Sequence, residues 1–98
     1  MDGIEYIGLV ASGLGALAFL PQVVRTLRSG SANDFSLPTL LMIEAGSSIW
    51  IFYGVLRDAP AIWLGNGIVV TLTGLILSVK LRNVFRKNRI AESLSSRA

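Results

Sequence analysis

Two residues within long apolar segments, Trp50 and Asn66, have side chains suited to binding a neutral molecule rich in hydroxyl groups. The indole ring of Trp50 can pack against the apolar C–H face of a sugar ring. The amide of Asn66 can donate hydrogen bonds to hydroxyl groups and accept hydrogen bonds from them. No charged residue stands at the same level of either segment, so the pair indicates an uncharged ligand.

Helical spacing places Trp50 and Asn66 at nearly the same depth. Trp50 lies seven residues before Arg57, about 10 Å along a helix, and Asn66 lies six residues after Pro60, about 9 Å. Only about four residues, from Arg57 to Pro60, connect the two segments, so we expect antiparallel neighbours. Gly46, one turn before Trp50, leaves room beside the indole. Steps of three and four residues mark one helix face, and they join Thr39, Ile43, Gly46, Trp50, Tyr53 and Arg57.

Both residues also have simpler explanations. Tryptophan often anchors a helix at the membrane–water interface, although a depth of about 10 Å argues against that role for Trp50. Asparagine in a spanning helix often forms a hydrogen bond with a neighbouring helix. From the sequence alone, packing and ligand binding are equally supported for Asn66, and small residues such as Gly46 have close helix packing as their default role.

Three apolar segments must position these side chains: residues 4–27, 37–56 and 61–79. Each is close to the roughly 20 residues that cross a bilayer core of about 30 Å. Charged residues make up 15% of the chain, compared with about 25% in soluble proteins. We therefore predict an all-α integral membrane protein, with residues 1–98 forming one three-helix bundle. Its spans should cover residues 4–27, 37–57 and 60–82, and a basic tail over residues 83–98 should fray at residues 92–98.

The ends of the second and third helices are marked by capping residues. Asp34 or Ser36 can cap the second helix, which has Pro38 in its first turn. Asp58 can cap the third helix, which has Pro60 in its first turn. The first loop contains residues 29–33, Ser-Gly-Ser-Ala-Asn, and this composition predicts flexibility.

The basic residues predict how the chain is oriented in the membrane. Arg25 and Arg28 precede the first loop, the second loop holds only Arg57 with Asp58, and the N-terminus is acidic. Basic residues also follow the third span, namely Lys80, Arg82, Arg86, Lys87, Arg89 and Arg97. The positive-inside rule therefore places the N-terminus outside and the C-terminus in the cytoplasm. Orientation and attraction to anionic membrane lipids explain the basic tail, so we expect no nucleic-acid partner.

The residue types exclude most catalytic chemistry. The chain contains no cysteine and no histidine, which removes disulfides, thiol chemistry and the usual metal ligands. Three spans within 98 residues leave no room for a separate catalytic domain. We therefore expect no catalytic residues, no metal and no cofactor, and we do not expect an enzyme.

Two further features stand out within the spans. Pro21 and Gln22 interrupt the first apolar segment, and the proline removes a backbone donor and clashes with the carbonyl of Leu17. Such a break is tolerated where protein or a water-filled cavity satisfies the freed groups, so this helix should bend. Glu44 lies within the second span, where a carboxylate is costly and is a functional candidate. It can bond Ser47 or Ser48, face a wet vestibule, or act as a proton site.

These residues resemble the SemiSWEET family, the bacterial half-size relatives of SWEET sugar transporters in the PQ-loop group. The resemblance rests on Leu20-Pro21-Gln22, on residues 50–54 (Trp-Ile-Phe-Tyr-Gly) and on Asn66, and it extends in order over residues 4–82. It implies a parallel homodimer around a central pathway. It also implies transport of a mono- or disaccharide, of the glucose or sucrose class, down its gradient across a bacterial plasma membrane.

The resemblance also implies roles for individual residues. Trp50 and Asn66 of both protomers would line the binding pocket, and Pro21 with Gln22 would form the hinge. An outer gate would map to Tyr53, Arg57 and Asp58. The inner gate is apolar in the family, and we place it at Met42 or Ile43. Glu44 has no counterpart in the family pattern, so it raises the question of proton coupling.

Two alternatives remain at the level of sequence. A PQ-loop transporter of another solute, such as an amino acid, would need charged groups near Trp50, and none is present there. A phage holin, which is a small lysis pore, can have three spans and a basic tail. Nothing in a holin requires Pro21-Gln22 or the matched depth of Trp50 and Asn66.

Overall fold

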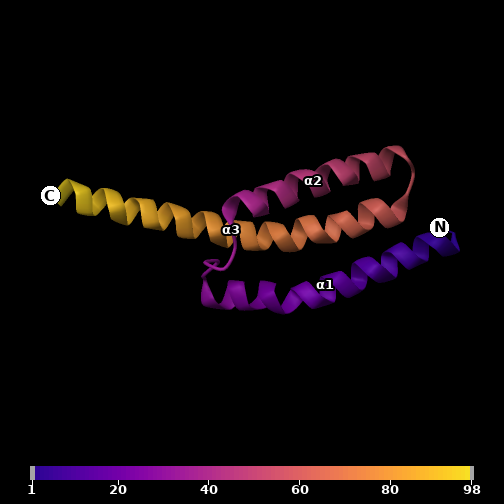
Figure 1. Cartoon of the computed structure of the whole chain (residues 1–98), viewed down its shortest axis with the longest axis horizontal. Helices are drawn as coiled ribbons and strands as arrows, with labels where there is room; N and C mark the ends of the chain where they lie inside the picture. The colour runs from indigo at the N-terminus through magenta and orange to yellow at the C-terminus, as the bar shows by residue number, and fades with distance from the viewer. Residues whose placement is uncertain (1, 98) are drawn as a thin grey trace.

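The computed structural model describes residues 2–97 and contains three α-helices: α1 (Gly3–Ser29), α2 (Leu37–Leu56) and α3 (Pro60–Arg97) (Figure 1). All three are long and apolar enough to cross a membrane. The expected fraying is wrong for residues 92–97, because α3 continues to Arg97. The reason is composition: no glycine or proline follows Gly74, so no helix breaker interrupts the tail. Residue 98 lies outside the described residues.

α3 lies between α1 and α2 and packs against both of them, whereas within residues 2–97 α1 and α2 do not pack against each other. The three helices thus form one layer in the spatial order α1–α3–α2 (Figure 1). The extents of 65 × 27 × 13 Å agree with a layer about one helix thick. The expected antiparallel pairing of the second and third spans is confirmed, but the helices do not close into a compact bundle.

The two predicted helix caps have different outcomes. At the start of α2, Ser36 rather than Asp34 is the cap, and its side chain accepts a hydrogen bond from the Thr39 backbone N at 3.5 Å. At the start of α3, Asp58 is not the cap, because it lies in the left-handed region at φ 53°. The backbone carbonyl of Ala59 instead accepts from the N of Ile62 at 3.1 Å. A tight reversal between antiparallel helices needs this conformation, and aspartate tolerates it better than most residues.

The loop between α1 and α2 is tied to α3, although its composition predicted flexibility. The Asn83 side chain accepts a hydrogen bond from the Ala32 backbone N at 2.8 Å and donates to the Gly30 carbonyl at 2.9 Å. Ala32 itself is buried with Val23, Leu40, Ile76 and Val79 in the small core. One asparagine on α3 therefore fixes a loop that lies about 50 residues earlier in the chain.

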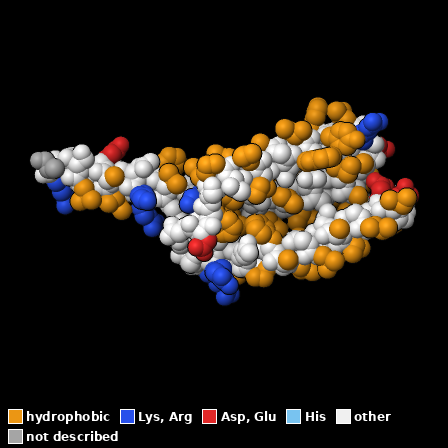
Figure 2. All heavy atoms as spheres, in the orientation of Figure 1, with side chains coloured by type: hydrophobic (Ala, Val, Ile, Leu, Met, Phe, Trp, Pro, Cys, Tyr) orange, Lys and Arg blue, Asp and Glu red, His pale blue; other side chains and the backbone are white. Residues whose placement is uncertain are grey.

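The charges separate along the layer. Figure 2 shows hydrophobic side chains over the three-helix part and also along the extension of α3, and most Lys and Arg side chains near the first loop or along this extension. Acidic side chains lie at the end that holds the N-terminus, and others lie near the first loop and on the extension. This is the charge distribution from which the orientation was predicted.

Close helix packing depends on two glycines that face α3 or lie on it. An ideal Cβ at Gly54 would lie 2.9 Å from Ile62 Cγ2 and 2.9 Å from the backbone N of Trp63. A Cβ at Gly65 would lie 3.2 Å from the Cβ of Ser12. Gly54 thus allows α2 to approach the backbone of α3, and Gly65 allows α1 to do the same from the other side.

We expect the Gly54→Ala variant to lower the melting temperature of the purified protein in detergent. Its methyl group meets backbone that cannot rotate away, so overpacking should cost about 1–3 kcal/mol. Gly13→Ala is the matched control, because an added Cβ there meets nothing within 4 Å. That variant should gain up to about 1 kcal/mol in helix propensity. Equal melting temperatures for the two variants would contradict the packing role of Gly54.

Candidate functional site

All three helices line one hollow on a face of the layer. It has a volume of about 330 Å³, and its lining consists of Ser12, Gly15, Ala16, Phe19, Ile43, Ile68, Val69, Leu72 and Thr73. Because α1, α2 and α3 all contribute, this face of the layer is concave. We call the face of α3 between α1 and α2 the central groove. Apart from two hydroxyl groups, its middle part is apolar.

Asn66 lies on the side of α3 that faces the central groove. Val69 and Thr73 line the hollow, and they follow Asn66 by three and seven residues, which keeps them on one helix face. The Asn66 side chain is half-buried, and its Nδ2 donates to the Ile62 carbonyl of its own helix at 2.9 Å. Oδ1 and the second N–H remain available to a ligand. Within the described chain the Asn66 amide is therefore not used to bridge two helices.

Trp50 lies on the groove side of α2. Ile43 lines the hollow, and Trp50 follows it by seven residues on the same helix face. The indole is 53% exposed and stands edge-on to Tyr53, with ring centroids 5.5 Å apart and an interplanar angle of 89°. Arg57 Cζ lies 6.0 Å from the centre of the Tyr53 ring. The structure thus brings Trp50, Tyr53 and Arg57 into one contiguous row.

The remaining predicted residues of the α2 stripe differ in position. An ideal Cβ at Gly46 meets nothing within 4 Å, so the space next to Trp50 is open. Of the two candidates for an apolar inner gate, Ile43 lines the hollow and is 39% exposed. Met42 is 75% exposed and does not line the hollow in the single chain. Asp58 lies in the turn beyond Arg57, next to the outer end of the row.

Glu44 is separate from Trp50 and Asn66. Its carboxylate points to Gly74 of α3, with both oxygens 3.8 Å from the position of an ideal Cβ there. Glu44 Oε1 is buried and has no hydrogen-bond partner, so it does not bond Ser47 or Ser48. The hollow is lined by Ile43, not by Glu44. The structure therefore places this carboxylate between α2 and α3, outside the groove.

Pro21 lies within the continuous helix α1, which bends along its length in Figure 1. The proline lines an open hollow together with Leu20, Val24 and Arg25. Gln22 instead lines a second pocket near the end of α1, which shares Arg25 with this hollow. The Pro-Gln pair is therefore at the cytoplasmic end predicted from the charges, well away from Trp50.

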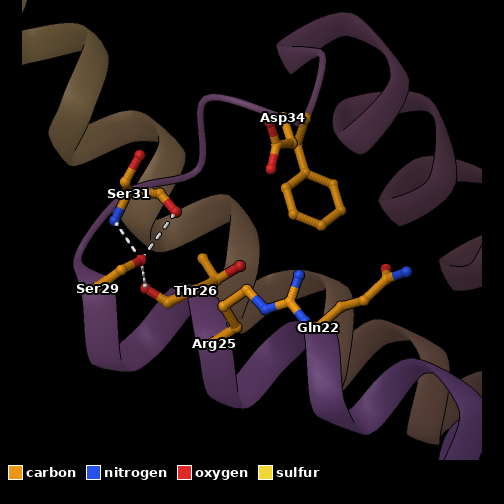
Figure 3. Close-up of a pocket in the computed structure, with 7 residues that line it drawn as sticks. Gln22, Arg25, Thr26, Ser29, Ser31 and Asp34 are labelled. Carbon is orange, nitrogen blue, oxygen red and sulfur yellow. Dashed lines mark hydrogen bonds between the residues drawn. The ribbon is translucent and has the colours of Figure 1, made fainter.

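This second pocket, which we call the inner pocket, has a volume of about 440 Å³ (Figure 3). Its lining residues are Gln22, Arg25, Thr26, Ser29, Ser31, Asp34 and Phe35. The inner pocket was not predicted from the sequence, in which Arg25 indicated only the orientation and Asp34 was only a candidate helix cap. The feature of the sequence that could have indicated this pocket is a pair of opposite charges and an aromatic ring close to the first loop.

Comparison with known proteins identifies the family. The PQ-loop repeat family matches residues 3–63. The sugar transporter SemiSWEET of Bradyrhizobium diazoefficiens is 39% identical over 80 residues, covering 81% of this chain and 92% of the relative. The sugar transporter SemiSWEET of Escherichia coli is 31% identical over 88 residues, covering 90% of this chain and 99% of the relative.

A solved structure agrees with the sequence relatives. The crystal structure of a SemiSWEET in the inward-open conformation matches with a TM-score of 0.83 and 32% identity, covering 95% of this chain and 99% of that chain. Fold, sequence and motif thus lead to one assignment over almost the whole described chain. This chain belongs to the PQ-loop repeat family and, within it, to the SemiSWEET family.

Proposed function

We propose that this chain is a facilitative transporter of mono- or disaccharides that works by alternating access as a parallel homodimer. The observation that carries the proposal is the hollow lined by Ile43 of α2 and Thr73 of α3, because helical register puts Trp50 and Asn66 on the same helix faces, although neither lines the hollow itself. The amide oxygen of Asn66 is available there. Relatives that are named sugar transporters support the substrate class, and transport is a non-enzymatic function. Glucose and sucrose represent the two sizes of sugar to be tested.

The open groove supports the homodimer. In the most apolar windows of α1, α2 and α3, only 6%, 17% and 22% of the residues are buried within the chain. A lone chain would expose Asn66 to lipid, where an amide without partners is costly. A two-fold axis along the membrane normal would place a second groove opposite the first. The resulting cavity would contain two copies each of Trp50, Asn66 and the open space at Gly46.

The charges support a single three-helix domain, residues 1–98, in a bacterial inner membrane, with its N-terminus outside. The basic residues of the first loop and of the α3 extension would then lie at the cytoplasmic leaflet, where anionic lipids attract them. In this orientation, the row of Trp50, Tyr53 and Arg57 is at the outer end. The inner pocket opens near the cytoplasm.

This arrangement places a gate at each end of the groove. Tyr53 and Arg57, with Asp58 of the same or the partner protomer, would close the outer end through ring contacts and an ion pair. Ile43, joined by Met42 across the dimer, would close the inner end through apolar contact. Pro21 and Gln22 would form the hinge of α1. The similarity to an inward-open SemiSWEET supports a chain that can open to the cytoplasm.

The position of Glu44 favours transport without a coupled proton. A coupling carboxylate should contact the substrate path or the moving gates. Glu44 instead faces Gly74 between α2 and α3. We therefore propose uniport. Proton coupling through Glu44 is the alternative, and transport measured under a pH gradient distinguishes the two.

Uptake of radiolabelled glucose and sucrose into liposomes that contain the purified protein tests this function. We expect saturable uptake of at least one sugar that stops when inside and outside concentrations are equal, as facilitated diffusion requires. A proton gradient should not change the final level. Leak of both sugars without saturation would contradict the proposal and indicate a pore. Accumulation above equilibrium under a proton gradient would contradict uniport.

A further inference from the structure

The inner pocket lies beyond the central hollow, toward the predicted cytoplasmic end of α1. Phe19 lines the central hollow, and Gln22 and Thr26 line the inner pocket. These residues follow each other by three and four positions, so they lie on one face of α1. The small core at Val23 separates the two spaces, and Phe19 and Phe35 pack against it from either side.

The inner pocket has opposite charges on facing walls. Figure 3 shows the Asp34 carboxylate above the pocket and the Arg25 guanidinium below it, each pointing toward the space between them. The guanidinium only donates hydrogen bonds and the ionised carboxylate only accepts them. An ion of one sign pairs with one wall and is repelled by the other. A zwitterion and a neutral molecule with many hydroxyl groups can each satisfy both walls, and the relatives named sugar transporters favour the second.

The other lining residues limit what can bind. Ser29 is occupied locally, since its Oγ accepts from the Ser31 backbone N at 3.2 Å (Figure 3). Phe35 is half-buried and supplies an apolar surface for C–H groups. The volume of about 440 Å³ is within the range of roughly 300–1,000 Å³ usual for small-molecule sites. Size and chemistry both suit a sugar.

The wall that carries Asp34 and Phe35 is held in place. Asn83 fixes the backbone of Gly30 and Ala32, and the Phe35 backbone N donates to the Ala32 carbonyl at 3.1 Å. The loop is thus anchored to α3 on one side of the pocket, while Arg25 belongs to α1. A pocket with a fixed wall can bind a ligand at a lower entropic cost than a mobile loop.

We propose that the inner pocket is a second sugar-binding subsite at the cytoplasmic mouth of the pathway, with Arg25, Asp34 and Phe35 as its binding residues. The inference rests on the proposed function and extends it. Sugar would pass from Trp50 and Asn66 to this subsite before it reaches the cytoplasm, and sugar from the cytoplasm would bind here first. The two subsites are lined by different residues, so each can be removed without the other.

Because the chain has no cysteine, a single introduced thiol is the one site that maleimide modifies. Ser31 also lines the neighbouring hollow that contains Asn33, so a thiol at Asn33 controls for binding there. Ser31→Cys places a thiol in the inner pocket, and Asn33→Cys places one on the same loop outside it. The rate of maleimide modification is measured in detergent with increasing glucose or sucrose, and with a polyethylene glycol too large for the pocket as the control for osmolality. Glycine betaine is the zwitterionic competitor, and protection by it but by neither sugar would overturn the proposal. At a sugar concentration of roughly ten times the dissociation constant, the Ser31→Cys rate should fall about tenfold. The Asn33→Cys rate should not change.

Two added substitutions separate this subsite from the central one. Protection of Ser31→Cys should persist when Asn66→Ala is added and should disappear when Asp34→Ala is added. Loss of protection with Asn66→Ala would overturn the proposal, because the effect would then come from the central site. Equal protection of both thiols, or of neither, would also overturn it. If the second subsite fails one of these tests but the wild type still shows saturable sugar uptake, the proposed function stands. If saturable uptake is also absent, the proposed function and the second subsite are both wrong.

Discussion

The Asn66→Ala variant is expected to lose saturable uptake of glucose and sucrose while remaining folded and dimeric. In the dimer the central cavity would contain two Asn66 amides, each with Oδ1 and one N–H free to bind the sugar. Four hydrogen bonds at about 1 kcal/mol each correspond to roughly a thousandfold weaker binding at the central site. Initial rates in liposomes and equilibrium binding to the purified protein measure the loss.

Thr71→Ala is the matched control for Asn66→Ala. The Thr71 Oγ1 donates to the Gly67 carbonyl at 2.9 Å, in the same way that the Asn66 side chain donates to Ile62. Thr71 is exposed and belongs to a different face of α3, where it lines a hollow outside the central groove. Both variants remove a bond from side chain to backbone in the same helix, so only the loss of a ligand contact distinguishes them. Equal sugar affinity in the two variants would reduce Asn66 to a packing residue.

The sequence was sufficient to predict the parts of the fold that depend on local rules. Hydropathy and length identified the three spans, because lipid requires long apolar helices whatever their neighbours are. The short connection after Leu56 predicted α2 and α3 as antiparallel neighbours, and helical spacing then predicted a common depth for Trp50 and Asn66. Side chains whose positions depend only on register along one pair of helices can therefore be placed from the sequence alone.

What could not be predicted depends on contacts between distant parts of the chain. The order α1–α3–α2 is set by which faces accept close packing, such as Gly54 against Trp63 and Gly65 against Ser12. Asn83 holds a loop about 50 residues away, and nothing in the composition of that loop indicates its partner. The inner pocket is formed by this tied loop.

The same distinction explains one wrong cap and the position of one carboxylate. Asp58 was predicted as a helix cap from its type, but the turn required a residue in the left-handed conformation and used aspartate for that. Glu44 was expected to lie off the Trp50 stripe, because the position next to Ile43 on a helix points about 100° away. The carboxylate therefore faces Gly74 rather than the groove.

The Pro21→Ala variant is expected to slow sugar transport without weakening sugar binding. Alanine restores the backbone N–H that can bond the Leu17 carbonyl, so α1 should straighten and resist bending. If one such bond of about 1 kcal/mol must break in each protomer, the barrier rises by about 2 kcal/mol and the rate falls roughly 30-fold. The dissociation constant should stay the same, because Pro21 does not line the central hollow.

The transport rate and the sugar affinity must be measured on the same preparation. A substitution at a hinge residue changes the rate alone, whereas a substitution at a binding residue also changes the affinity. Pro38→Ala is the control, since a proline in the first turn of α2 replaces no hydrogen bond within the helix. Pro21→Ala should also raise the melting temperature, because the helix gains a bond. If the variant has a higher melting temperature but unchanged transport, the bend of α1 is a fixed feature of the fold and does not change during transport. The outer and inner gates would then have to alternate through rigid rotation of one protomer against the other.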